Sequence, residues 1–127
     1  ITKGQMKLYH YFIGGLFFLA LNQPPAISMT EQEMGKAIGF SAIVDCLIRT
    51  GKEPEKERDP MTKYFLERNN LTHAESYIKS EKGRTAVTIV SAGGFLDEKC
   101  EFKSMDKETM IRLNRILVYY APTERKN

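Results

Sequence analysis

The sequence predicts a mainly helical α+β domain with a β-hairpin in the C-terminal half of the chain. Three observations predict it: helical spacing of apolar residues near both ends, two helix-capping patterns between them, and two β-favouring segments around a glycine turn. The 127 residues fit a single domain over residues 1–127, and 42% hydrophobic residues are sufficient for a core.

The first predicted helix covers residues 5–21. Its apolar residues recur at helical spacing on most sides, which is typical of a helix in a core or in an oligomer interface. This pattern predicts an interface with a second copy of the chain, giving a homodimer, or with another protein. The predicted interface residues are Leu8, Phe12, Leu16 and Leu19.

The segment over residues 6–27 also resembles a secretory signal, because Lys7 precedes an apolar run over residues 11–21. That run, about 11 residues long, is shorter than the roughly 20 that a membrane span needs, so no span is predicted. Cys46 and Cys100 fit no metal-binding spacing. Two free thiols in a cytoplasmic protein are the favoured interpretation, and a disulfide is expected if the protein is exported.

A capping pattern predicts a second helix from Thr30, because the Thr30 and Glu33 side chains can each accept a hydrogen bond from the other's backbone. Gly39 predicts the end of this helix. Ser41 then predicts the cap of a third helix that runs to about Arg49.

Residues 51–60 include seven charged side chains and two prolines, and they predict an exposed charged loop. A short helix is predicted after this loop. Thr72 and Glu75 repeat the capping pattern and predict a helix through Lys82, which Gly83 ends.

Residues 84–90 and 95–102 are rich in β-favouring residues and flank a Ser-Ala-Gly-Gly turn, so they predict the hairpin. The final predicted helix buries Leu113 and Leu117 and turns Asn114 outward. Residues 122–127 predict a flexible tail. This order of elements is compatible with a winged helix.

Residues 30–52 resemble the helix-turn-helix of the phage-repressor family in their spacing. Thr30 stands at the cap, Gly35 where two helices would cross, and Gly39 at the turn between them. The resemblance implies a winged-helix or helix-turn-helix regulator that binds nucleic acid. The residues that would contact nucleic acid are Lys36, Ser41, Arg49, Lys52 and, near the hairpin, Arg84.

The stretch that would read bases has little hydrogen-bonding capacity, because residues 42–47 are apolar except for Asp45. The formal charge of +3 is also spread along the chain. The stretch is therefore predicted to pack within the protein. No catalytic motif, metal-ligand spacing or cofactor signature is present. The leading hypothesis is a non-enzymatic protein that binds a macromolecular partner, and the nucleic-acid-binding regulator is the alternative.

Overall fold

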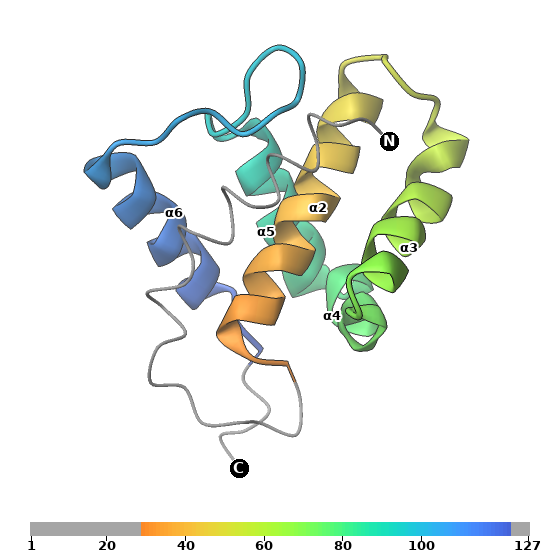
Figure 1. Ribbon diagram of the computed structural model, residues 1–127, viewed down its shortest axis with the longest axis horizontal. Coiled ribbons are helices and arrows are strands. Elements are labelled where there is room, and N and C mark those ends of the chain that lie inside the picture. Colours follow the sequence, from red (N-terminus) through yellow and green to blue (C-terminus); the bar gives the residue numbers. More distant parts are fainter. Residues whose placement is uncertain (1–28, 123–127) are drawn as a thin grey trace.

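The helical elements of the computed structural model, which describes residues 29–122, surround a central helix, α2 (Glu31–Arg49). Figure 1 shows α3 on one side of α2, α6 on the other, and α5 behind it. Helix α2 packs against all three and against α4, and most extensively against α5. The predicted helix over residues 5–21 with Leu8, Phe12, Leu16 and Leu19, the signal-like segment up to residue 27, and the tail after Pro122 lie outside the described residues.

The start of α2 confirms the first capping pattern. Glu33 N donates to Thr30 Oγ1 and Thr30 N donates to Glu33 Oε1, both at 3.1 Å. The predicted turn at Gly39 is wrong, because one continuous helix runs from Glu31 to Arg49. Helix α2 is buried along most of residues 34–46, and this packing outweighs the roughly 1 kcal/mol by which a glycine weakens a helix.

Helix α3 (Arg58–Arg68) begins inside the segment predicted as a charged loop, directly after the 3₁₀ turn η1 (Glu55–Glu57). Pro60 lies in its first turn, where a missing backbone N–H breaks no helical hydrogen bond. On its inner side Phe65 stacks on Phe40 of α2, with ring centroids 5.1 Å apart. This contact fixes α3 along one side of α2.

The second capping pattern does not form. Thr72 lies in the 3₁₀ turn η2 (Thr72–Ala74), and the short helix α4 (Glu75–Lys79) begins without a side-chain cap. Ser80 instead caps helix α5 (Glu81–Ala92) by accepting a hydrogen bond from Gly83 N. Gly83 therefore lies in the first turn of α5, whereas the sequence predicted it at the C-terminal end of the preceding helix. A Cβ there would lie 1.9 Å from the Tyr77 carbonyl oxygen, so glycine lets α4 and α5 approach closely.

The predicted β-hairpin and the α+β class are wrong, because residues 84–90 belong to α5. Gly83, Ala86, Val87 and Val90 are buried at the three- and four-residue spacing of one helix face. The prediction gave more weight to the β preference of Thr and Val than to this spacing. Residues 95–102 form a loop with one antiparallel bridge, Leu96 to Phe102. Residues 29–122 contain no strand, so the comparison with a winged helix does not hold.

Helix α6 (Lys107–Tyr119) confirms the final predicted helix. Asp106 caps it by accepting a hydrogen bond from Thr109 N at 2.8 Å. Leu113 and Leu117 are buried as predicted. Asn114 differs from its prediction, because it is half-buried and its Oδ1 atom is buried without a hydrogen bond to any described residue.

A disulfide joins Cys46 of α2 to Cys100 in the 95–102 loop. The interpretation of two free thiols is therefore wrong. Cys100 has a positive φ of 62°, and its sulfur lies 3.8 Å from Thr50 Oγ1. The bond ties a segment without regular secondary structure to the central helix, across 54 positions of sequence.

Candidate functional site

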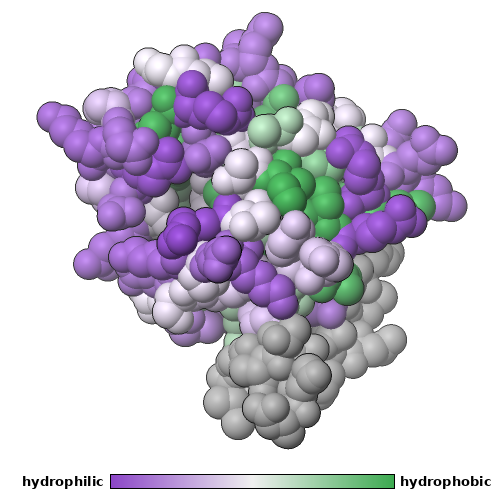
Figure 2. Space-filling model, turned by 180° about the vertical axis from the view of Figure 1, so that it is seen from behind, coloured by the Kyte–Doolittle hydropathy of each residue, from purple (hydrophilic) through white to green (hydrophobic). Residues whose placement is uncertain are grey.

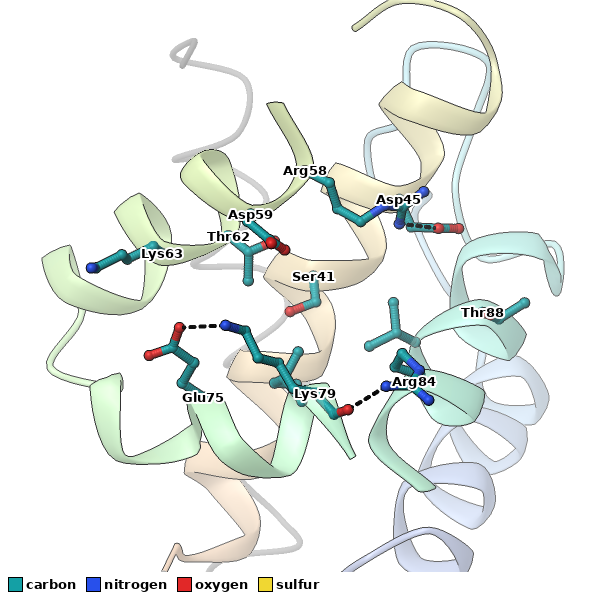
Figure 3. A pocket seen from close by; sticks show the side chains of 12 residues that line it. Ser41, Asp45, Arg58, Asp59, Thr62, Lys63, Glu75, Lys79, Arg84 and Thr88 are labelled. Atoms are coloured by element: carbon teal, nitrogen blue, oxygen red, sulfur yellow. Dashed lines mark hydrogen bonds and ion pairs between the residues drawn. The ribbon is translucent and has the colours of Figure 1, made fainter. Parts of the chain in front are cut away.

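A pocket of about 370 Å³ opens between α2, α3, α4 and α5. Figure 3 shows its side chains converging from all four helices. The lining combines charged, hydroxyl and apolar groups. Its residues are Ser41, Asp45, Arg58, Asp59, Thr62, Lys63, Glu75, Ile78, Lys79, Arg84, Val87 and Thr88.

Ser41 lies on the α2 side of the pocket, and Figure 3 shows its hydroxyl directed into the space between the helices. The residue is only 4% exposed, and its Oγ makes no hydrogen bond with any described residue. A buried hydroxyl without a partner costs about 1–3 kcal/mol. Such a group inside a pocket is suited to hydrogen-bond a ligand.

Arg58 is held by two carboxylates. Its Nη1 donates to Asp45 Oδ1 at 2.7 Å, and its Nε donates to Glu55 Oε2 at 2.5 Å. These hydrogen bonds, first with Glu55 and then with Asp45, raise the pKa of the Arg58 guanidinium. Asp45 also lies 3.6 Å from Arg49 Nε. The charge of Arg58 is therefore compensated within the protein.

Lys79 is also compensated, because its Nζ lies 3.2 Å from Glu75 Oε2. Arg84 donates through Nη1 to the backbone oxygen of Lys79, which orients its guanidinium without neutralising it. Within residues 29–122, Arg84, Lys63 and Asp59 have no ion-pair partner. All three side chains are exposed and solvated, so the pocket rim carries charges of both signs that a ligand can pair with.

Of the predicted nucleic-acid-binding residues, Ser41 and Arg84 meet in this pocket. Arg49 instead donates from Nη2 to Ser91, at 3.0 Å to the carbonyl oxygen and 2.9 Å to Oγ. Lys52 is exposed beyond the end of α2, and Lys36 is half-buried on α2. Lys36, Arg49 and Lys52 do not line the pocket, and Ser41 is buried. The five residues therefore form no common exposed surface.

The sequence interpretation missed Asp59 as a site residue because it lay in the segment assigned to an exposed loop. An informative signal was present: Asp59 and Pro60 are both favoured in the first turn of a helix. That signal predicts the start of α3, but it does not predict that α5 lies across the pocket from α3.

Comparison of the chain with protein-family models, curated proteins and solved structures gave no match. The geometry therefore carries the functional argument. No helix within residues 29–122 is both long and apolar enough to cross a membrane. The same residues include no cluster of three His, Cys, Asp or Glu side chains placed to hold a metal ion.

A second surface feature lies on α6. Ile111, Val118 and Tyr119 are exposed, and Tyr119 has 73% of its surface open. Separations of seven and eight residues place them on one face of the helix. Much of the molecular surface seen from behind is hydrophilic, with apolar residues gathered among the polar ones (Figure 2). We name Ile111, Val118 and Tyr119 the α6 stripe.

Proposed function

We propose that the protein binds a small polar molecule in the pocket between α2, α3, α4 and α5, without catalysing a reaction. The buried, unpartnered hydroxyl of Ser41 carries this proposal. Ligand pockets typically have volumes of about 300–1,000 Å³ and a few convergent polar groups. The described lining contains no histidine, the side chain that most often acts as the base for a serine nucleophile, which favours binding over catalysis.

The test is a titration of the ¹⁵N-labelled protein with four classes of polar compound: amino acids, sugars, nucleosides and carboxylic acids. We expect at least one class to shift the amide signals of residues that line the pocket. Ser41→Leu places a larger apolar side chain on the pocket wall and should abolish those shifts. If none of the classes shifts these signals at millimolar concentration, the proposal is wrong.

Ser91 provides a matched control for whether the Ser41 hydroxyl has a hydrogen-bond partner in the folded protein. Both serines are 4% exposed, but Ser91 Oγ accepts a hydrogen bond from Arg49. Ser91→Ala should lower the free energy of unfolding by about 0.5–1.5 kcal/mol, whereas Ser41→Ala should leave it unchanged or raise it. Urea denaturation compares the two variants. A larger loss for Ser41→Ala would show that its hydroxyl has a structural partner.

An oxidising compartment is the location we propose, in place of the cytoplasmic location favoured by the sequence. The Cys46–Cys100 disulfide supports it, because such bonds persist in exported proteins and are rare in the cytosol. The signal-like pattern of residues 6–27 agrees with export. Alkylation of the protein from its native cells, without reductant, should label neither cysteine. Labelling of both would contradict this location.

A second candidate function is association of two copies of the chain through the α6 stripe. This surface differs from the interface predicted from the sequence, whose residues Leu8, Phe12, Leu16 and Leu19 lie outside the described residues. The exposure of Ile111, Val118 and Tyr119 on one helix face favours it, because two-fold dimers use the same apolar patch on both copies. We expect sedimentation at micromolar concentration to show a dimer, and Val118→Ser/Tyr119→Ser to show a monomer. A wild-type monomer at that concentration would exclude this dimer.

A further inference from the structure

We infer that the ligand of the pocket is a small zwitterion that carries one carboxylate and one ammonium group, as a free amino acid does. This inference rests on the proposed small-molecule function and specifies its ligand class. Arg84 would bind the carboxylate, Asp59 the ammonium group, and Ser41 would donate its hydroxyl hydrogen to the carboxylate.

The charged residues of the lining favour a ligand that carries one positive and one negative charge. Arg58 is paired with Asp45 and Lys79 with Glu75. The charged lining residues that have no ion-pair partner within residues 29–122 are Asp59, Lys63 and Arg84. Figure 3 shows Lys63 extending away from the centre of the pocket. The same view places Asp59 on the α3 side and Arg84 on the α5 side, with Ser41 between them. An acceptor and a donor of opposite charge therefore face the pocket from two walls.

A ligand of a single charge fits these walls less well. A phosphate or another multiply charged anion would meet the carboxylate of Asp59, and a cation would meet Arg84. An uncharged polyol would form no ion pair with either of these exposed side chains. A zwitterion satisfies both, and the planar guanidinium of Arg84 is suited to bind a carboxylate through two hydrogen bonds.

The apolar part of the lining and the size of the pocket limit the ligand further. Ile78 of α4 and Val87 of α5 are buried residues that supply the apolar part of the lining. The volume of about 370 Å³ is at the low end for ligand pockets, which favours a single amino acid over a peptide or a dinucleotide. An aliphatic side chain such as that of leucine would lie against Ile78 and Val87.

The experiment measures binding of the twenty free amino acids, by amide-signal titration and calorimetry. For leucine, the singly charged analogues are 4-methylpentanoate, which lacks the amine, and 3-methylbutylamine, which lacks the carboxylate. We expect an amino acid to bind and each of its analogues to bind at least about tenfold more weakly, because each lacks one charge-assisted hydrogen-bonded pair.

Two variants assign the charges to their walls. Asp59→Asn removes the partner of the ammonium group, so it should bind leucine no more tightly than 4-methylpentanoate. Arg84→Gln removes the partner of the carboxylate, so it should bind leucine no more tightly than 3-methylbutylamine. Arg112→Gln is the matched control. Arg112 is also an exposed arginine that donates to a backbone oxygen, that of Gly93, but it does not line the pocket, so this variant should bind as the wild type does.

The outcomes separate the ligand class from the general function. If an analogue binds as tightly as its amino acid, or if only a sugar or nucleoside shifts the pocket signals, the zwitterion is wrong and small-molecule binding stands. If no compound shifts those signals, both are wrong. Binding of an amino acid that Asp59→Asn and Arg84→Gln leave unchanged would also overturn the inference.

Discussion

Removal of the Cys46–Cys100 disulfide is expected to lower the free energy of unfolding by about 4 kcal/mol. The cysteines are 54 residues apart in sequence, so the bond closes a long loop and restricts the unfolded chain strongly. It also holds the 95–102 loop, which includes the fully buried Phe95, against the helical core. Loss of several kcal/mol is a large share of the stability of a small domain.

The measurement is urea denaturation of Cys46→Ser/Cys100→Ser beside the wild type, with and without reductant. Reductant should move the midpoint of the wild type toward that of the double variant and leave the variant unchanged, because the chain has no further cysteine. Equal midpoints for oxidised and reduced wild type would show that the bond contributes nothing to stability.

Sequence patterns correctly predicted a helix end where the residues that form it are close together in the chain. The capping box at Thr30 and Glu33 needs only residues three apart, and it forms as predicted. Gly39 was misinterpreted because a glycine ends a helix only where packing does not hold the helix together, and α2 is buried on both sides of that residue. The spacing of buried residues in α5 was the correct signal over residues 84–90, against the β preference of its threonines and valines.

The candidate site was less predictable, because its residues come from four helices. Ser41 and Arg84 were singled out by sequence, but for contact with nucleic acid. Their common position in a pocket depends on how α5 packs against α2, which no local pattern encodes. The disulfide is similar: the spacing of Cys46 and Cys100 left both the free and the paired states open, and the fold brings their Cα atoms to 5.7 Å.

Truncation of either buried leucine of α6 is expected to be the other large effect. Leu113 and Leu117 are each 1% exposed in the core cluster, and α6 packs against α2 and α5. Leu113→Ala or Leu117→Ala should lower the free energy of unfolding by about 2–5 kcal/mol, because each removes buried apolar surface and leaves a cavity. Denaturation midpoints in urea measure this loss.

Arg115→Ala is the appropriate control for this helix, since Arg115 is exposed between the two leucines. It should change the free energy of unfolding by less than about 0.5 kcal/mol. Asn114→Ala should also cost much less than either leucine change, because the Asn114 Oδ1 atom has no hydrogen bond to any described residue that would be lost. The relative order of the variants tests which face of α6 is buried. If Arg115→Ala proved more damaging than Leu113→Ala, α6 would have to present a different face to α2 and α5.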